Sequence, residues 1–265
     1  MLASFALTAT VTACGSMSMP SVEGLGRMGA AALPIGPAKE QEIGFGIAAT
    51  VAGRYGLVED PALNQYVSLV GSAVAEQSLR AGEVEFHFGI LDTDDVNAFA
   101  TPGGYIFITR GALALMESEA ELAGVLAHEV AHVDEKHVLD DIRRAGVMSS
   151  ASDEAQLSGP LLDAVSEAGA SLLFTGLSRE DEMQADSLGL IYARAVGYRP
   201  DGMLQFLAHL DAAVEEEEGG LREWVATHPP TTERADKLRA DMAAAGIRPD
   251  AGVDGERRFR ARARR

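Results

Sequence analysis

The sequence contains little cysteine, little positive charge and no long apolar run, and each shortage excludes a class of protein. A single cysteine cannot form an intrachain disulfide framework. No stretch reaches the roughly 18 apolar residues that a transmembrane helix needs. The 22 Lys and Arg residues face 40 Asp and Glu residues, whereas a nucleic-acid-binding protein needs a basic surface, so we expect no nucleic-acid partner. The 265 residues, 47% of them hydrophobic, are enough for one domain with a sizeable core.

The formal net charge of -18 is unevenly distributed. Six of the 22 basic residues lie within residues 257–265, so residues 1–256 hold 16 basic and 40 acidic residues. We expect residues 248–265 to be a disordered basic tail. It could contact anionic lipid headgroups, at about 1 kcal/mol per cationic side chain, or it could only keep the chain soluble.

The N-terminus resembles a bacterial lipoprotein signal peptide. Residues 1–13 carry no charge and are mostly apolar or small, which suits the apolar region of such a peptide. The stretch Val11–Cys14 resembles a lipobox, which implies that Cys14 is lipidated and becomes the new N-terminus. Because neither Gly15 nor Ser16 is the Asp that favours retention at the inner membrane, we expect the periplasmic face of the outer membrane.

Residues 14–37 are then the lipid anchor and a flexible tether, because they are rich in Gly, Ser, Met, Ala and Pro without a helical or strand period. No Lys or Arg precedes Cys14, so the usual cationic start of a signal peptide is missing and the natural start could lie upstream. The alternative is an ordinary apolar N-terminus with a buried thiol.

Residues 38–247 are expected to form one α+β domain that is mostly helical with a small β-sheet. Apolar residues at helical spacing predict helices over residues 38–80, interrupted at Asp60-Pro61. Alternating side chains predict a strand at residues 84–92, and an apolar run predicts another at 105–109. Further helices are expected at residues 118–138, 160–175, 178–195 and 201–214. Helices followed by short strands and more helices favour a single domain.

The helix that begins at Ser118 carries a metal-site motif. Ser118 and Glu121 form a capping box that starts the helix. His128 and His132 lie four residues apart, so both imidazoles project from one face and can reach one zinc ion. Glu129 can accept a proton from a zinc-activated water as general base. Apolar neighbours predict a buried helix, in which these groups would be costly without a metal or hydrogen bonds; the alternative is a surface helix with coincidental histidines.

A catalytic zinc site also needs a third protein ligand and an open position for water. Several carboxylates lie together on the helix predicted over residues 178–195. Spacing alone does not choose among Glu180, Glu182 and Asp186.

Four stretches in this order resemble the gluzincin peptidases of the HtpX and CAAX-prenyl-protease type, peptidase family M48, and among them its periplasmic lipoprotein members. The stretches are Asn97–Gly104, Leu126–His132, Ser178–Asp186 and Thr227–Pro229. The resemblance implies a zincin-type fold with one zinc ion (Zn2+) per chain and Glu182 as the third ligand. It also implies that Asp186 orients a ligand histidine through its other ring nitrogen; a solvated carboxylate is the alternative for Asp186.

His228 and Arg234 match a histidine-proline pair and a following arginine of the same family. Near zinc, either residue could stabilise the oxyanion that forms when water attacks a peptide carbonyl. His228 could instead occupy the open zinc position in a latent enzyme. The alternative is that His228 caps a loop and Arg234 lies on a solvated helix face.

A strand beside the metal could bind the substrate backbone. Gly103, Gly104, Tyr105 and Ile106 are expected to offer an exposed strand edge that pairs with an extended peptide, which would suit broad specificity. A purely structural strand is the alternative.

The leading hypothesis is a membrane-tethered zinc endopeptidase of the bacterial cell envelope. The resemblance implies that it cleaves unfolded or misassembled envelope proteins in protein quality control. Two other classes remain open: a non-proteolytic, chaperone-like or binding lipoprotein that uses the same cleft, and a zinc amidase acting on cell-wall peptides.

Overall fold

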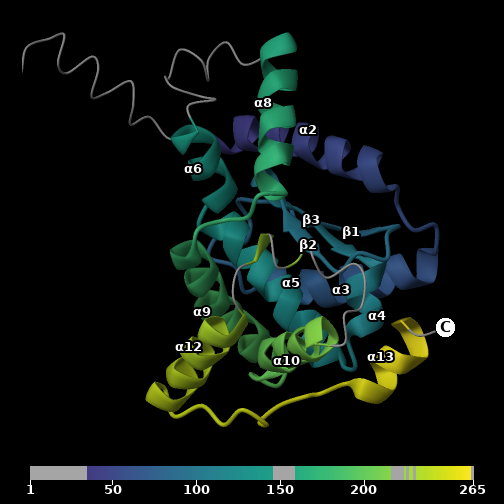
Figure 1. Ribbon diagram of the computed structural model, residues 1–265, viewed down its shortest axis with the longest axis vertical. Helices are drawn as coiled ribbons and strands as arrows, with labels where there is room; N and C mark the ends of the chain where they lie inside the picture. Colours follow the sequence, from purple (N-terminus) through teal and green to yellow (C-terminus); the bar gives the residue numbers. More distant parts are fainter. Residues whose placement is uncertain (1–34, 146–158, 216–223, 225–226, 229–230, 264–265) are drawn as a thin grey trace, which may run out of the picture.

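The computed structural model describes residues 35–145, 159–215, 224, 227–228 and 231–263 (Figure 1). These residues form a mostly helical domain with a three-stranded sheet, so the predicted α+β class is confirmed. The helices are α2 (Pro37–Tyr55), α3 (Pro61–Ala75), α4 (Arg110–Leu115), α5 (Glu119–Asp134), α6 (His137–Arg144), α8 (Pro160–Leu173), α9 (Arg179–Val196), α10 (Gly202–Glu215), α12 (Thr231–Ala244) and α13 (Glu256–Ala263). The strands are β1 (His87–Leu91), β2 (Ala98–Ala100) and β3 (Tyr105–Thr109), with a 3-10 turn η1 (Pro102–Gly104) before β3.

Helix α5 lies in the middle of the domain. Ser118 caps it as the sequence predicts, because its Oγ accepts a hydrogen bond from the Glu121 N–H at 3.2 Å. All residues from Glu119 to Val133 are buried, under α3, α9, α10 and the sheet. A second apolar cluster joins α2, α6 and α8 to the sheet on the other side. The apolar side chains of α5 all belong to the main core cluster, which holds this helix in place.

The chain turns sharply where α5 ends. The sequence predicts a helix through residue 138, but α5 ends at Asp134 and α6 begins at His137. Between them Lys136 has a φ of 58°, a left-handed conformation that is uncommon outside glycine. Because the helical period continues across this point, the sequence pattern does not reveal the turn.

The sheet has the order β1-β3-β2. Strand β3 is parallel to β1 and antiparallel to β2, with Phe99 opposite Phe107. The strands predicted at residues 84–92 and 105–109 correspond to β1 and β3. Strand β2 is not among the predicted strands, because it has only three residues and is followed closely by Pro and Gly.

The C-terminal segment is not the disordered tail predicted for residues 248–265. Residues 256–263 form α13, and its anchor is the side chain of Phe259, which is 0% exposed against the main core. Arg258 Nε donates to the buried carboxylate of Glu119 at 2.6 Å, and two tyrosine hydroxyls donate to the same carboxylate. The buried aromatic side chain and the ion pair help to dock a segment that looks disordered by charge alone.

The predicted signal peptide, Cys14 and most of the predicted tether lie outside the described residues, which begin at Ile35. Within the described part of the chain, no helix combines the length and apolar character needed to cross a membrane.

Replacing Phe259 with Ala is expected to lower the free energy of unfolding by about 3 kcal/mol, because a fully buried aromatic side chain is lost and leaves a cavity. Urea unfolding followed by circular dichroism measures this change. Leu79→Ala is the control, since Leu79 is 72% exposed and its loss should change stability by less than about 0.5 kcal/mol. An unchanged midpoint for Phe259→Ala would contradict the docking of α13.

Candidate metal centre

Helix α5 places two histidines at the centre of the domain. His128 and His132 project from the same face, and their Nε2 atoms lie 2.9 Å apart. Their exposures are 0% and 2%, so neither imidazole is solvated. Two buried ring nitrogens directed at one another leave lone pairs aimed at a common point, which is the arrangement that a shared metal ion requires.

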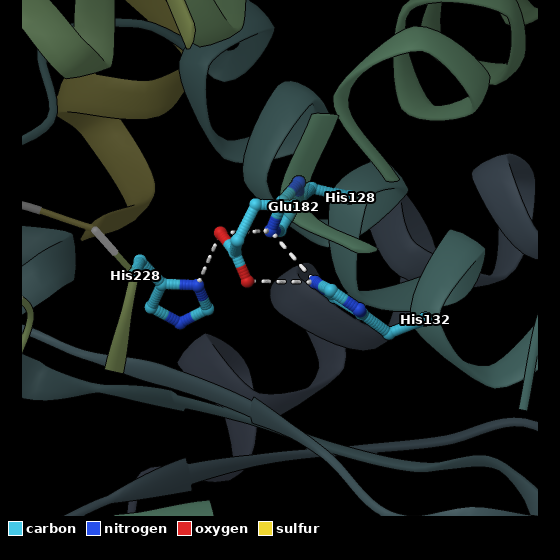
Figure 2. Close-up of side chains that lie close together, drawn as sticks. All are labelled: His128, His132, Glu182 and His228. Atoms are coloured by element: carbon cyan, nitrogen blue, oxygen red, sulfur yellow. Dashed lines mark hydrogen bonds and ion pairs between the residues drawn. The ribbon is translucent and has the colours of Figure 1, made fainter. Parts of the chain in front are cut away.

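Helix α9 brings a carboxylate to the same point (Figure 2). Glu182 Oε2 lies 3.5 Å from Nε2 of His128, and Oε1 lies 3.4 Å from Nε2 of His132. The two helices approach closely at Gly189, where an added Cβ would lie 2.9 Å from the backbone nitrogen of His128. This close contact lets a side chain of α9 reach between the histidines.

A fourth residue completes the group. His228, which follows α10 in the chain, has its Nδ1 3.0 Å from Glu182 Oε2 and packs against the ring of Trp224. Ligand atoms of His128, His132, Glu182 and His228 all lie within 4.8 Å of one another. Three imidazoles and a carboxylate are nitrogen and oxygen donors that zinc and other transition metals accept, so this group fits a metal ion.

The three carboxylates that the spacing left open occupy different positions. Glu180 is exposed on the first turn of α9, whereas Glu182 and Asp186 are buried against α5. Asp186 Oδ1 lies 3.0 Å from Nδ1 of His128, the ring nitrogen on the side away from Glu182. A carboxylate at that nitrogen fixes the orientation and tautomer of a ligand imidazole.

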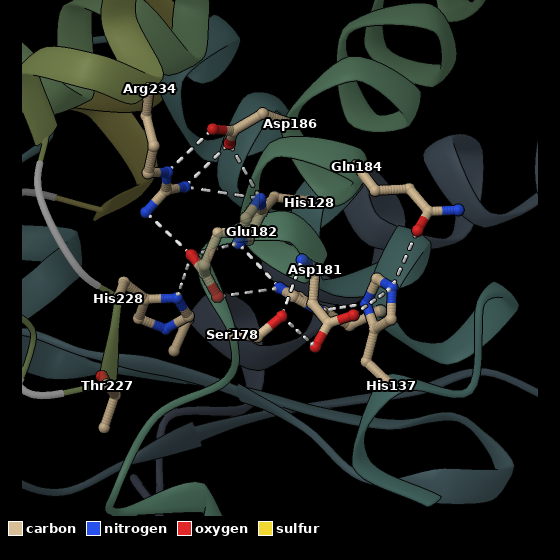
Figure 3. Close-up of polar contacts among 12 residues, drawn as sticks. His128, His137, Ser178, Asp181, Glu182, Gln184, Asp186, Thr227, His228 and Arg234 are labelled. Atoms are coloured by element: carbon tan, nitrogen blue, oxygen red, sulfur yellow. Dashed lines mark hydrogen bonds and ion pairs between the residues drawn. The ribbon is translucent and has the colours of Figure 1, made fainter. Parts of the chain in front are cut away.

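Arg234 on α12 holds both buried acids (Figure 3). Its guanidinium donates to the two oxygens of Asp186 at 2.7 Å each, and its Nη1 lies 2.9 Å from Glu182 Oε2. Arg234 is 1% exposed, so the alternative that places it on a solvated helix face is wrong. Nε and Nη2 hydrogen-bond to Asp186, whereas Nη1 pairs with Glu182 by charge and makes no hydrogen bond among the described residues, which indicates that Arg234 mainly holds these acids in place.

The charges of the acids follow from this pairing. Burial by itself raises the pKa of Glu182. The nearby His228 and Arg234 outweigh this effect, so that the pKa lies well below its usual range. Burial likewise raises the pKa of Asp186, and the charge and hydrogen bonds of Arg234 outweigh it and lower the pKa. Both acids are therefore ionised at neutral pH and can attract a cation.

The pKa values of the two metal-site histidines on α5 are shifted in opposite directions, and that of Glu129 is raised. Burial lowers the pKa of His132 to about 3, which keeps its imidazole neutral and available as a ligand. Burial also lowers the pKa of His128, but hydrogen bonds to Asp186 and Glu182 raise it to about 9, so a metal ion would displace a proton there. Burial raises the pKa of Glu129.

His137 is a site residue that the sequence analysis missed. Five positions after His132, it is expected to turn away from the metal, yet its Nδ1 lies 2.8 Å from Nδ1 of His132. Its Nε2 is 3.3 Å from Gln184 Oε1 on α9. The left-handed Lys136 redirects the chain and makes this contact, so His137 supports the second histidine as Asp186 supports the first.

Glu129 lines a pocket beside the metal group. Its Oε1 is buried and has no hydrogen-bond partner among the described residues. The other walls are formed by β2, by His132 and His228, and by apolar side chains such as Val138 and Leu173. A buried carboxylate oxygen without a partner is unusual and is free to accept a proton in the pocket.

The strand predicted to bind the substrate, β3, lies in the middle of the sheet. Tyr105 and Ile106 begin β3, which is hydrogen-bonded to a strand on each side and has no exposed edge. Gly103 and Gly104 belong to η1 with φ values of 73° and 96°, and a Cβ on Gly103 would lie 2.5 Å from Gln41 Cα. These glycines therefore serve a tight turn, with Gly103 against α2 and Gly104 against the backbone of Glu85.

The strand edge beside the pocket belongs to β2. Asn97 O accepts from Thr109 N, and Thr101 N donates to Tyr105 O, so these residues bond towards β3. Because hydrogen bonding alternates along a strand, the backbone of Ala100 is directed away from β3, and Ala100 lines the pocket. The Thr227 hydroxyl donates to the Asn97 side chain at 3.2 Å and ties the His228 segment to this strand.

A buried helix with two histidines, an adjacent free glutamate and a carboxylate from a second helix define a metallopeptidase centre. The model of peptidase family M48 matches residues 61–242, so the chain belongs to this family and is a metalloendopeptidase, as the resemblance implied.

Three relatives bear names of the same kind. The beta-barrel assembly-enhancing protease of Escherichia coli (strain K12) is 26% identical over 210 residues, which cover 73% of this chain and 41% of the relative. The mitochondrial metalloendopeptidase OMA1 of Schizosaccharomyces pombe is 30% identical, over 59% of this chain and 46% of the relative. Metalloprotease YcaL of Escherichia coli is 29% identical, over 59% of this chain and 62% of the relative. The chain thus matches about two fifths of the length of the first relative.

Glu182→Gln is expected to lower metal affinity by more than about 100-fold, because a ligand is lost rather than an outer contact. Glu180→Gln, two residues away on the exposed face of α9, is the matched control and should bind metal as the unmodified chain does. Competition with a chromophoric chelator measures both affinities. Equal losses in the two variants would contradict the assignment of Glu182.

Proposed function

We propose that the protein is a zinc-dependent endopeptidase that hydrolyses unfolded or misassembled proteins of the bacterial cell envelope. The observation that carries the proposal is the convergence of His128, His132 and Glu182 on one point, with the free carboxylate oxygen of Glu129 in the adjoining pocket. Membership of family M48 supports peptide-bond hydrolysis. The name of the Escherichia coli relative, beta-barrel assembly-enhancing protease, supports a role in the envelope.

The chemistry divides between the metal and the chain. His128, His132 and Glu182 would hold zinc, which when bound supplies a Lewis acid that acidifies water and polarises the scissile carbonyl. Glu129 accepts a proton from the attacking water at Oε1 and donates it to the leaving amine. Burial raises the pKa of Glu129, which makes its carboxyl a better proton acceptor than a solvated glutamate.

Other residues of the site hold these groups in position. Asp186 and His137 contact the Nδ1 atoms of His128 and His132. Each imidazole therefore keeps its Nε2 atom directed towards the position that a metal ion would occupy. Arg234 holds Glu182 and Asp186 through its nitrogens. We therefore assign Arg234 an indirect role, in place of direct oxyanion stabilisation.

His228 has two possible functions at its position. Its nitrogen lies within the metal group, where it could fill the open coordination position and keep the enzyme latent. If His228 left the metal free, the same imidazole could donate to the oxyanion of a substrate carbonyl. The ring of Trp224 stacks on His228 with 4.4 Å between the ring centroids and orients the imidazole.

The substrate would bind as an added strand. An extended peptide would pair with the outer edge of β2, whose three residues are buried in the substrate-free chain, and main-chain pairing tolerates many sequences. Only an unfolded segment can adopt this form, which supports unfolded or misassembled proteins as substrates.

Glu129→Gln is expected to reduce kcat on an unfolded protein such as casein by at least about 1,000-fold, because the proton acceptor is lost while the metal ligands remain. Release of acid-soluble peptides measures the rate, and atomic absorption measures one zinc per chain in both proteins. Native-rate cleavage by Glu129→Gln would refute the mechanism.

The same assay separates the two other classes. Zinc-loaded protein that cleaves neither casein nor cell-wall peptides but suppresses aggregation of an unfolded protein would indicate a chaperone-like lipoprotein. Cleavage of cell-wall peptides alone would indicate an amidase. In both cases the endopeptidase proposal fails.

We also propose that the enzyme is tethered to the periplasmic face of the outer membrane by lipid on Cys14, with residues 1–13 as the signal peptide and residues 14–37 as anchor and tether. The lipobox-like sequence Val11–Cys14 supports this placement.

Cys14→Ser is expected to move the protein from the membrane fraction to the soluble fraction of the cell envelope, because the acyl chains that provide stable anchoring are lost. Detergent phase partitioning followed by immunoblotting measures the distribution. Ser16→Ala, two residues further along, is the control and should remain with the membrane. Unchanged partitioning of Cys14→Ser would argue against lipidation.

A further inference from the structure

A second buried charge cluster lies apart from the metal group and joins α2 to the C-terminal end of α5 and to the turn that follows β2. Glu40, on the first turn of α2, is 1% exposed. Arg80 donates to both of its oxygens, at 2.7 and 2.9 Å, and Lys136 Nζ lies 3.1 Å from Oε2. The backbone N–H of Gly103 also donates to Oε1, at 3.3 Å. One carboxylate thus contacts three separate segments of the chain.

Two of these contacts hold the end of the metal-binding helix. Arg80 Nη1 donates to the carbonyl of Val133 at 3.0 Å, and Val133 directly follows His132. Lys136 is the left-handed residue at which the chain leaves α5. Through Arg80 and Lys136, Glu40 fixes the position of the C-terminal end of α5.

The third contact holds the turn that follows the substrate-binding edge. Gly103 lies in η1, three residues after β2 ends at Ala100. The Thr101 hydroxyl also donates to the Gly44 carbonyl of α2 at 3.1 Å. At Gly44 an added Cβ would lie 1.5 Å from the Pro102 carbonyl oxygen, so the turn packs directly on the helix backbone.

We propose that Glu40 is a positioning residue that sets the distance between β2 and the metal-binding helix α5. This inference rests on the proposed function, in which β2 binds the substrate backbone and α5 carries two metal ligands and Glu129. Glu40 contacts neither the metal ligands nor the pocket; it acts through Arg80, Lys136 and Gly103. It also lies outside residues 61–242, the part matched by the family model.

Stability alone is a poor reason for such a cluster. Replacing both members of a buried ion pair with apolar residues is often neutral or stabilising, whereas removing one member is strongly destabilising. A pair that only held the core together could therefore be apolar. Contacts with Val133 O and Gly103 N need polar groups at fixed positions, and this requirement distinguishes positioning from packing.

The test compares Glu40→Gln with the double variant Glu40→Leu/Arg80→Met. Both lose the charged contacts, but the double variant leaves no unpaired buried charge at either position and should recover stability lost in the single variant. We expect kcat on a peptide substrate to fall at least about tenfold in both, with KM changed less than about threefold, because the scissile carbonyl is displaced from Glu129. Zinc content should remain one per chain.

Glu83→Gln is the matched control, because Glu83 binds the same guanidinium from the solvent side, with its side chain 47% exposed. It should leave kcat and KM unchanged. If Glu40→Gln does not fold, Lys136→Met tests the same cluster from its more exposed side, and kcat should again fall.

Hydrogen exchange of the metal-free proteins gives a readout that does not depend on activity. Amides of residues 98–105 should exchange at least about tenfold faster in the double variant, because Gly103 N loses its acceptor. The exchange in Glu83→Gln should match that of the unmodified chain.

Recovery of kcat together with stability in the double variant would overturn the inference, and so would unchanged exchange of residues 98–105. An unmodified, zinc-loaded protein that cleaves nothing would instead refute the proposed function, and the exchange experiment would still decide the role of Glu40.

Discussion

The pairing of one buried arginine with two buried acids is the interaction on which the metal centre depends. Glu182 and Asp186 lie one turn apart on α9, where Glu182 faces both histidines and Asp186 faces His128. Without Arg234 their mutual repulsion and their removal from water would raise both pKa values and favour the neutral acids. A neutral Glu182 is a poor ligand, and a neutral Asp186 no longer fixes His128 in one tautomer. Arg234 therefore allows the acids to remain charged where the chemistry needs them, and it joins α12 to α9 and α5.

Such pairing requires helices that approach closely. At Gly124 an added Cβ would lie 2.7 Å from the Met203 nitrogen, and at Gly202 it would lie 2.1 Å from the Ala120 carbonyl oxygen. With Gly189 facing His128, small residues thus bring both α9 and α10 against the backbone of α5. A wider spacing would place the carboxylates beyond reach of the imidazoles. The geometry of the metal centre therefore depends directly on the close packing of these helices in the core.

The sequence predicts the parts of the centre that are local. His128, Glu129 and His132 lie on one helix, so spacing alone indicates their convergence. Glu182 required the family resemblance, because nothing in spacing says which carboxylate of α9 faces α5. His137, β2 and α13 were missed for a shared reason: each is decided by contacts distant in sequence. A left-handed Lys136 brings His137 back to the site. Pairing with β3 makes a strand of three residues that directly precede a turn, and one buried Phe259 docks an otherwise charged helix.

The two ends of α5 are held by segments that flank the family match. At its start, Glu119 accepts hydrogen bonds from Arg258 of α13, and at its end the Val133 carbonyl accepts from Arg80, which Glu40 of α2 holds. Residues 61–242 thus contain the reacting groups, whereas α2 and α13 fix the helix that carries them. Glu40 lies four residues after Gly36, close to the segment proposed as tether. If the proposed tether is correct, it would join the domain at the first turn of α2, the same turn that carries Glu40.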